Sequence, residues 1–396
     1  MDSTNDWVTD DYVTRVVTDP AQLAAAAWDT LLAQHPQGAH SGPFMRHAYL
    51  AALHHSGSAV PETGWTPQWL TLWQGDTLCA AAPLYEKQHS YGEYVFDWAW
   101  ADAHARHGLP YYPKGLVAVP FTPVPGPRLL ARDAPARQAL LQALRDHAQA
   151  SGWSSLHLLF AAEADRHSSA AAGLLARLTV QFHWQNAGYA DFEAFLAALA
   201  QDKRKKIRQE RRKVAEAGVR FEARRGAEIS ADNWAFFYRC YHRTYLEHGN
   251  QPYLSPAFFA AMADELAPYW LLFTAYRGAT PISCSLIALS DDSAQPQAAY
   301  GRYWGALERV DCLHFEACYY QPLAWCLAHG VQRFEGGAQG EHKMARALLP
   351  VSTHSAHWLA HPAFADAVAR YLEREDSGVG QYLAHLDSRT PLRRPA

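Results

Sequence analysis

The stretch 269–289, YWLLFTAYRGATPISCSLIAL, predicts a β-hairpin. Its two apolar runs have the length and composition of strands, and Arg277-Gly278-Ala279 between them is typical of a turn. The stretch 68–85, QWLTLWQGDTLCAAAPLY, has the same design around Gln74-Gly75-Asp76. The chain therefore contains two similar hairpins, one in each half.

Each hairpin is followed by a similar helix and strand. In the first half, a helical stretch 136–150 closes at Gly152 and precedes the strand 155–160, and in the second half the helix 314–329 closes at Gly330 before the strand 331–335. A glycine just past a helix supplies the left-handed conformation that ends it. We expect two copies of one mixed α/β unit, with domains at residues 1–187 and 188–390 of the 396-residue chain.

Three further segments have clear patterns. Residues 191–217 predict one long helix with an apolar stripe and a basic face, ended by Gly218. The proline-rich stretch 119–127 predicts a shaped loop. Residues 362–386 predict two helices that are broken near Ser377-Gly378.

Composition limits the class of protein. The net charge of −4 argues against a protein that coats nucleic acid, and the six cysteines form no CxxC pair or other zinc-type spacing, so no metal is expected. Residues 1–20 lack a basic start and an apolar run, so they do not resemble a signal peptide. No segment approaches the length of apolar chain that spans a bilayer. We expect a cytoplasmic protein in which most cysteines are core residues.

The glycine-rich segment 334–346, FEGGAQGEHKMAR, is the strongest candidate for a functional site. Exposed amides at such a turn, together with a following helix, can bind phosphate or pyrophosphate. A tight turn with solvated charges is the alternative, and no P-loop or dinucleotide-binding pattern is present. The expected donor-binding residues are Gly336, Gly337, Gln339, Gly340, Lys343 and Arg346.

The same segment offers proton acceptors. Glu335, Glu341 and His342 are candidate general bases, because an amine nucleophile must lose a proton when it is acylated. His314 and Glu316, at the start of the preceding helix, are second candidates, with helix capping as the alternative for Glu316.

Two other groups of residues are candidate substrate contacts. The basic run 203–213 contains Arg204 and Arg208 and is either a phosphate-binding surface or a solvated helix face. The second group mixes aromatic and charged residues, which indicate either a core or an acidic substrate groove. Its members are Tyr91, Glu93, Tyr94, Asp97, Trp98, Tyr112 and Lys114.

Four segments together resemble a bacterial FemAB-like family of the GNAT acyltransferase superfamily, which is associated with peptidoglycan biosynthesis. They are the stretches 91–98, 111–120, 203–212 and 334–343, and the similarity extends over residues 42–386. The resemblance implies tandem GNAT-like domains and acyl transfer to an amine, from acyl-CoA or from aminoacyl-tRNA. Residues 335–340 fit the usual GNAT pyrophosphate loop only loosely, and Pro322 and Ala347 depart from the family pattern.

The sequence thus favours an N-acyltransferase that acts by direct attack of an amine, because no cysteine or serine lies in a nucleophile signature. In this hypothesis the glycine-rich loop holds acyl-CoA, Glu341 or His342 is the base, and the first domain holds a small-molecule or peptide amine. The alternatives are a tRNA-dependent aminoacyl transferase and a non-catalytic module that binds a peptide or glycan.

Overall fold

A computed structural model describes residues 7–9, 12–338 and 340–393 of the chain. The chain forms two compact units, of which unit 1 consists of Met1–Thr179 and Ser352–Gln381 and unit 2 of Val180–Val351 and Tyr382–Ala396. The domains expected from the sequence were continuous ranges that met at residues 187 and 188. The structure instead assigns residues 352–381 to unit 1, because a strand from the second half of the chain pairs there with a strand from the first half.

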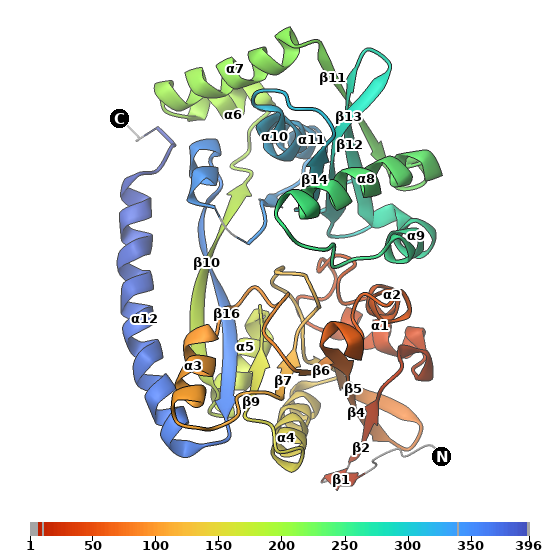
Figure 1. Ribbon diagram of the computed structural model, residues 1–396, viewed down its shortest axis with the longest axis vertical. Helices are drawn as coiled ribbons and strands as arrows, with labels where there is room; N and C mark the ends of the chain where they lie inside the picture. The colour runs from red at the N-terminus through yellow and green to blue at the C-terminus, as the bar shows by residue number, and fades with distance from the viewer. Residues whose placement is uncertain (1–6, 10–11, 339, 394–396) are drawn as a thin grey trace. The chain divides into compact units, whose positions relative to one another are not determined.

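Unit 1 contains two groups of strands (Figure 1). The first is a sheet in the order β1-β2-β4-β5-β8, and the second has the order β16-β9-β7-β6-β3, in which β7 and β9 are parallel. The bounds are β1 (Trp7–Thr9), β2 (Tyr12–Val17), β3 (Trp65–Pro67), β4 (Trp69–Gln74), β5 (Thr77–Ala82), β6 (Leu84–Lys87), β7 (Lys114–Val117), β8 (Leu130–Ala131), β9 (Ser155–Leu158) and β16 (Leu349–Leu359).

Two helices of unit 1, η1 and α4, begin at a side-chain cap. Asp133 accepts a hydrogen bond from the Ala136 amide at 2.8 Å and so starts α4, the longest helix that lies wholly in unit 1. The bounds are η1 (Pro20–Gln22), α1 (Ala25–Gln34), α2 (His47–His55), η2 (Pro61–Thr63), α3 (Trp98–Arg106), α4 (Ala134–Ala150), α5 (Glu163–Ala171) and α12 (Pro362–Ser388), the last of which continues into unit 2.

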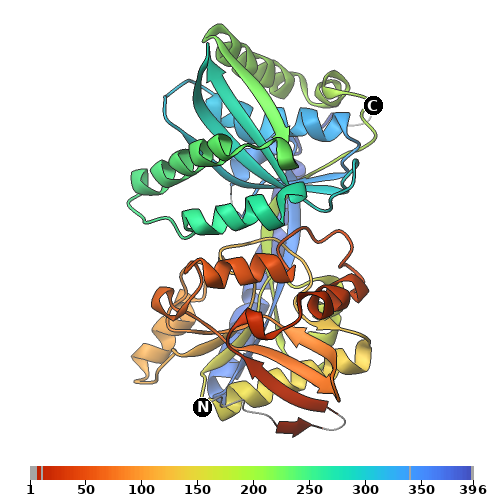
Figure 2. The ribbon, with the colours of Figure 1, turned by 90° about the vertical axis from the view of Figure 1, so that its right-hand side faces the viewer.

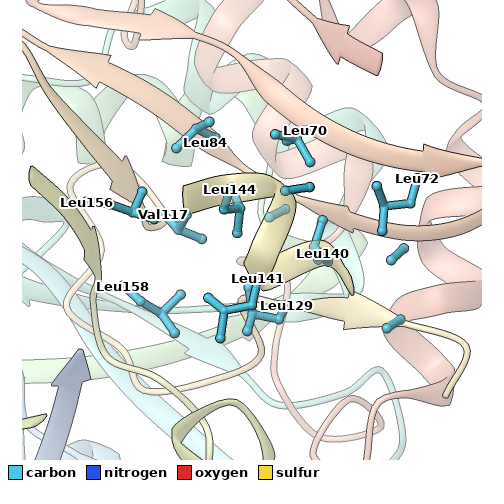
Figure 3. Packing of buried hydrophobic residues seen from close by; sticks show 14 of the residues in the cluster. Leu70, Leu72, Leu84, Val117, Leu129, Leu140, Leu141, Leu144, Leu156 and Leu158 are labelled. Atoms are coloured by element: carbon cyan, nitrogen blue, oxygen red, sulfur yellow. The ribbon is translucent and has the colours of Figure 1, made fainter. Parts of the chain in front are cut away.

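The apolar face of α4 forms the core of unit 1. Leu140, Leu141 and Leu144 are buried against leucine and valine side chains from both groups of strands (Figure 3). Burial of this face explains why the amphipathic pattern of residues 136–150 predicts the helix correctly.

Unit 2 contains a sheet in the order β11-β12-β13-β14-β15-β10. Its pairs are antiparallel except for β14 and β15, which are parallel. The bounds are β10 (Leu175–Gln185), whose first residues belong to unit 1, β11 (Val219–Arg225), β12 (Trp270–Arg277), β13 (Thr280–Leu289), β14 (Ala298–Ala306) and β15 (Arg333–Glu335).

Helices cover both faces of this sheet (Figure 2). Leu271 and Phe273 of β12 pack with the helical segment 313–328, whereas Trp270 meets Trp234 of α8 on the other face. A Cβ atom on Gly305 would lie 2.1 Å from the Cys240 carbonyl oxygen, so glycine is needed where α8 crosses β14. The bounds are α6 (Phe192–Ala198), α7 (Gln201–Glu216), η3 (Gly226–Glu228), α8 (Ala231–Glu247), α9 (Pro256–Glu265), η4 (Ala267–Tyr269), α10 (Leu313–Phe315), the π-helical turn η5 (Glu316–Tyr320), α11 (Gln321–Ala328) and η6 (Glu341–Arg346).

Both hairpins, both helices and both following strands of the predicted repeat are present, as β4–β5, α4 and β9 in unit 1 and as β12–β13, α10–α11 and β15 in unit 2. In each unit the helix joins two parallel strands, β7 to β9 and β14 to β15. None of the helices in the described parts of the chain is long and apolar enough to span a membrane.

Two helix predictions were wrong. The segment 191–217 is two helices rather than one, because Leu199 is extended and forms a β-bridge with Leu392, while the Ala200 amide donates to the Pro391 carbonyl at 2.8 Å. Residues 362–386 lie in one continuous helix, α12, in which the Ser377 hydroxyl donates to the Glu373 carbonyl at 3.0 Å. Glycine weakens the interior of a helix by about 1 kcal/mol relative to alanine but does not by itself end it.

We expect Leu144→Ala to lower the free energy of unfolding by about 2–5 kcal/mol, because it removes a fully buried side chain of α4 and leaves a cavity. Urea denaturation followed by circular dichroism measures this change. The control is Gln142→Ala on the exposed face of the same helix. A loss for Leu144→Ala no larger than for this control would contradict the packing described here.

Candidate active site

The site is built where two parallel strands of unit 2 diverge. β14 pairs with β15 from Ala298 to Tyr300, opposite Arg333 to Glu335. Beyond this point β14 continues to Ala306, whereas the other strand ends and the chain turns at Gly336. The two strands therefore form a fork at Gly336.

A cavity of about 160 Å³, here called the fork cavity, lies at this divergence. A Cβ atom on Gly301 would lie 3.2 Å from the Phe334 ring and 3.3 Å from the Glu335 carbonyl oxygen, so glycine allows the strands to approach closely just before they separate. The lining residues come from β13, β14, the helical segment and the glycine-rich loop. They are Ser285, Ile287, Gly301, Arg302, Tyr303, Trp304, His314, Cys318, Tyr319 and Gly336.

His314 is the titratable imidazole in this cavity. Its ring centroid lies 4.9 Å from that of Trp304 and 5.7 Å from that of Tyr319. Burial, and then the nearby charges of His342 and Arg346, lower the pKa of His314 to about 4. The imidazole is therefore uncharged at neutral pH and can accept a hydrogen bond or a proton.

His342 lies across from Tyr319 on the glycine-rich loop. The Tyr319 hydroxyl is 3.4 Å from His342 Nε2, and burial followed by the charges of Lys343 and Arg346 lowers the pKa of His342. His342 also lines a second cavity of about 500 Å³, here called the loop cavity. The contact between Tyr319 and His342 thus joins one wall of the fork cavity to one wall of the loop cavity.

The loop cavity is lined by more charged residues than the fork cavity. It is bounded by α7, η6 and the C-terminal segment after α12. Its lining residues are Ala200, Asp202, Lys203, Glu341, His342, Met344, Ala345, Arg389, Thr390 and Pro391.

Lys343 holds the glycine-rich loop together from within. Its Nζ donates to the Gly337 carbonyl at 3.0 Å, and burial lowers its pKa to about 8. The Gly336 amide points at the Phe182 carbonyl at 3.5 Å, and the Lys343 amide donates to the Gly340 carbonyl at 3.0 Å. Gln339, another predicted donor contact, lies outside the described residues.

Arg346 is also engaged within the protein. Its Nη2 lies 2.9 Å from Glu210 Oε2, its Nη1 donates to the His342 carbonyl at 3.1 Å, and its guanidinium lies 3.5 Å from the centre of the Phe315 ring. With only 4% of its side chain exposed, Arg346 positions the loop. This pairing argues against the predicted direct contact between Arg346 and a phosphate.

The three predicted acidic residues have different surroundings. Glu335 is buried, with Oε1 3.0 Å from Arg333 Nε and Oε2 3.7 Å from His183 Nε2, and burial raises its pKa to about 7. Glu316 is buried beside Arg211 of α7, at 3.2 Å, and burial raises its pKa.

Glu341 is exposed and pairs with Arg389, with the Tyr382 hydroxyl at 3.4 Å. Of the three carboxylates, only Glu341 lines either cavity of the site.

The basic face of α7 borders a third cavity, of about 420 Å³, here called the arginine cavity. Arg208, Arg211, Arg212 and Arg220 line it, together with Glu193 and Glu316. Arg208 pairs with Glu193 at its rim, and Arg204 lies one helical turn earlier, half-buried. The arginines thus gather around a concave surface, although part of their charge is balanced locally.

The charged residues that were expected to form an acidic groove in unit 1 face inward instead. Lys114 Nζ donates to Ser90 Oγ and to Glu93 Oε2, both at 2.8 Å, and to Asp97 Oδ2 at 2.5 Å. Glu93, Asp97 and Lys114 are all buried, so a substrate does not reach them. Both carboxylates are paired with Lys114 inside the protein.

The aromatic residues of the same region are divided between surface and interior. Tyr91 and Trp98 are 60% and 41% exposed, with ring centroids 5.4 Å apart. Tyr94 has a φ of 62°, and the Tyr112 hydroxyl lies 2.8 Å from Ser90 Oγ. The exposed pair remains a candidate substrate surface.

A buried histidine pair in unit 1 was missed by sequence reasoning. His157 Nδ1 of β9 and His357 Nδ1 of β16 are 2.7 Å apart. The Nε2 atoms of these rings lie 2.8 Å and 2.9 Å from the hydroxyls of Ser155 and Ser355. The repeated Ser-x-His pattern was the available signal, and it was overlooked among 21 histidines.

Solved structures with a similar fold are known. The crystal structure of FemX superposes with a TM-score of 0.51 at 10% sequence identity, covering 88% of this chain and 98% of FemX. L-PGS from Bacillus licheniformis gives a TM-score of 0.48 at 9% identity, covering 82% of this chain and 96% of that protein. A tandem GNAT protein from the clavulanic acid biosynthesis pathway gives 0.41 at 12% identity, covering 88% and 98%. The mixed α/β fold predicted from the sequence is confirmed.

Comparison with curated proteins gives no significant match. The model of the FemAB-like family, described as peptidoglycan biosynthesis/recognition, matches residues 19–394. Because this match covers nearly the whole sequence, the chain belongs to the FemAB-like family.

Proposed function

We propose that the chain is an N-acyltransferase that moves an acyl or aminoacyl group from an activated donor to an amine. The observation that carries this proposal is the contact between Tyr319 and His342, which joins the fork cavity to the loop cavity. Two neighbouring cavities with an uncharged imidazole at their junction suit a reaction between two substrates. Membership of the FemAB-like family supports the same reaction class.

In this mechanism the acyl group occupies the fork cavity and the amine approaches from the loop cavity. The amine nitrogen attacks the carbonyl carbon of a thioester or ester, so that a C–N bond forms and the C–S or C–O bond breaks. The proton lost by the amine passes to His342, which returns it to the leaving group through the Tyr319 hydroxyl or through water. The fork cavity is small, about 160 Å³, so it holds only a short acyl or aminoacyl group.

We assign His342 as the base for geometric reasons. It contacts both Tyr319 and the loop cavity, whereas Glu341 in the same cavity is held by Arg389. His314 lines the fork cavity and is the second candidate. Glu316 and Glu335 are buried against Arg211 and Arg333, and neither lines the fork or the loop cavity, so we give them a positioning role.

The donor is proposed as acyl-CoA or aminoacyl-tRNA. The amides of Gly337 and Gly340 remain the proposed contacts for donor phosphate at the loop, whereas Lys343, buried and bonded to the Gly337 carbonyl, supports the loop from within. The arginine cavity favours a tRNA-dependent reaction as the second candidate, because four arginines around one concave surface suit a polyanion. A cytoplasmic location and an amine of a peptidoglycan precursor as acceptor are consistent with either donor.

A titration separates these donors. We expect heat of binding on addition of acetyl-CoA, or of an aminoacyl-tRNA, to the purified chain in a calorimeter. The absence of binding by both would instead favour the non-catalytic module.

With the donor identified, we expect His342→Ala to lower kcat/KM by about 10²-fold or more, because it removes the proton acceptor. Tyr319→Phe keeps the ring and should lower kcat with little effect on KM. Because only neutral His342 accepts a proton, the wild-type rate should rise with pH through a pKa below the ordinary histidine value and then level off. His248→Ala, an exposed histidine on the end of α8, is the control. Full turnover of His342→Ala would refute the assignment.

If the donor is an aminoacyl-tRNA, we expect the triple variant Arg204→Glu, Arg208→Glu, Arg212→Glu to bind tRNA more weakly. The slope of log K against log salt should fall by about 0.7–0.9 for each phosphate contact that is lost. Filter binding between low and physiological salt measures the slope. Arg211 is left intact because its loss would leave Glu316 buried without its partner.

The matched control for this experiment is the triple variant Arg239→Glu, Arg243→Glu, Arg277→Glu, which changes exposed arginines elsewhere in unit 2. Equal weakening by both triple variants would show that only net charge matters.

Glu335→Gln tests the buried carboxyl by its effect on stability. Burial raises the native pKa of Glu335 from 4.5 to about 7, so the native state binds this proton more tightly than the unfolded state does. The wild type therefore loses stability as the pH rises from 4.5 to 7, and the variant should not. Between pH 5 and pH 8 we expect the stability of the variant relative to the wild type to increase by about 1–3 kcal/mol.

Urea denaturation at several pH values measures this difference. Glu247→Gln, which removes an exposed carboxylate from α8, gives the general effect of losing one negative charge. A difference that is independent of pH would contradict the assignment.

A further inference from the structure

Three metal-ligating side chains converge in unit 1, outside the candidate active site. They are Asp19, His54 and His55, and each offers one ligand atom within 4.8 Å of the other two. The closest pair is His55 Nε2 and Asp19 Oδ1, at 3.1 Å. Two ligands of a tetrahedral zinc ion, each about 2.1 Å from the metal, lie about 3.4 Å apart, so this pair already has the required separation.

The backbone holds these side chains in place. Asp19 precedes η1 and accepts a hydrogen bond from the Ala21 amide at 2.9 Å, while His54 and His55 are the last residues of α2. His47, at the other end of α2, has its Nε2 2.9 Å from the Pro20 carbonyl oxygen and so fixes η1 against the helix. Side chains on two elements that are already joined lose less freedom when they bind an ion.

A second observation, an unpaired buried nitrogen, concerns His54. Its Nδ1 is buried, yet it has no hydrogen-bond partner among the residues that the structure describes. A buried ring nitrogen of this kind is uncommon, since nearly all buried polar atoms are paired. A bound cation beside His54 would explain the unpaired nitrogen, whereas a plain ion pair between Asp19 and His55 would not.

We propose that Asp19, His54 and His55 form a zinc site in which water completes the coordination. Two imidazoles and one carboxylate suit Zn²⁺ better than Mg²⁺ or Ca²⁺, which prefer oxygen ligands throughout. Asp19 and His55 are 45% and 51% exposed, so the ion has access from solvent. Binding requires the His54 ring to move closer to the other two ligands. The ion then fastens the segment before η1 to the end of α2 and stabilises unit 1.

Calorimetric titration of the full-length protein with ZnCl₂, after EDTA treatment and dialysis, tests the proposal. We expect the wild type to bind one equivalent of zinc and the double variant His54→Gln, His55→Gln to bind none. The wild type should bind neither MgCl₂ nor CaCl₂. Asp19→Asn should weaken the affinity by at least about tenfold while keeping the hydrogen bond to Ala21. Zinc in excess should raise the Tm of the wild type by about 3 °C and leave the Tm of the double variant unchanged.

The matched control is the double variant His167→Gln, His248→Gln, which removes two exposed histidines elsewhere and should bind zinc like the wild type. Absence of zinc binding by the wild type would overturn the proposal. Equal binding by the wild type and the His54→Gln, His55→Gln variant would overturn it as well, because another of the 21 histidines would then be the ligand. If that double variant does not fold, Asp19→Asn alone decides between the outcomes. None of these results depends on acyl transfer.

Discussion

The buried ion pair between Glu210 and Arg346 is the constraint on which the candidate active site depends. It joins α7 to η6, and the guanidinium also covers the Phe315 ring at the start of the intervening helical segment. Moving two charges out of water is costly, and the added hydrogen bonds from Tyr320 to Glu210 and from Arg346 to the His342 carbonyl offset that cost. Because Arg346 donates a hydrogen bond to the His342 carbonyl, the Glu210–Arg346 ion pair fixes the position of the His342 imidazole relative to Tyr319.

Much of the fold was predictable because it depends on local patterns. The hairpins 68–85 and 269–289 and the helix 136–150 carry their own periodicity and turn residues, and the structure contains all three. The break between α6 and α7 was not predictable, since it comes from a bridge between Leu199 and Leu392, far apart in the sequence. Likewise, nothing local in the sequence shows that a helix continues through Ser377 and the two glycines after it.

The candidate site was predictable only in part. The motif 334–346 identified His342, whereas Tyr319 and the fork cavity emerge only when β14 and β15 pair and then separate. For the acidic residues of unit 1, the sequence pattern is visible but the contacts that bury these residues are not. The sequence shows Glu93 and Asp97 among aromatics, but only the folded chain brings Lys114 between them and removes all three from solvent.

The last strand of each half of the chain, β10 or β16, pairs with a strand from the other half. In unit 1, β9 pairs with residues 356–359 of β16, and in unit 2, β15 pairs with residues 183–185 of β10. The last strand of each half of the chain therefore pairs within the sheet of the other half. A chain cut between the two halves would therefore leave the sheet of unit 1 without β16 and the sheet of unit 2 without β10.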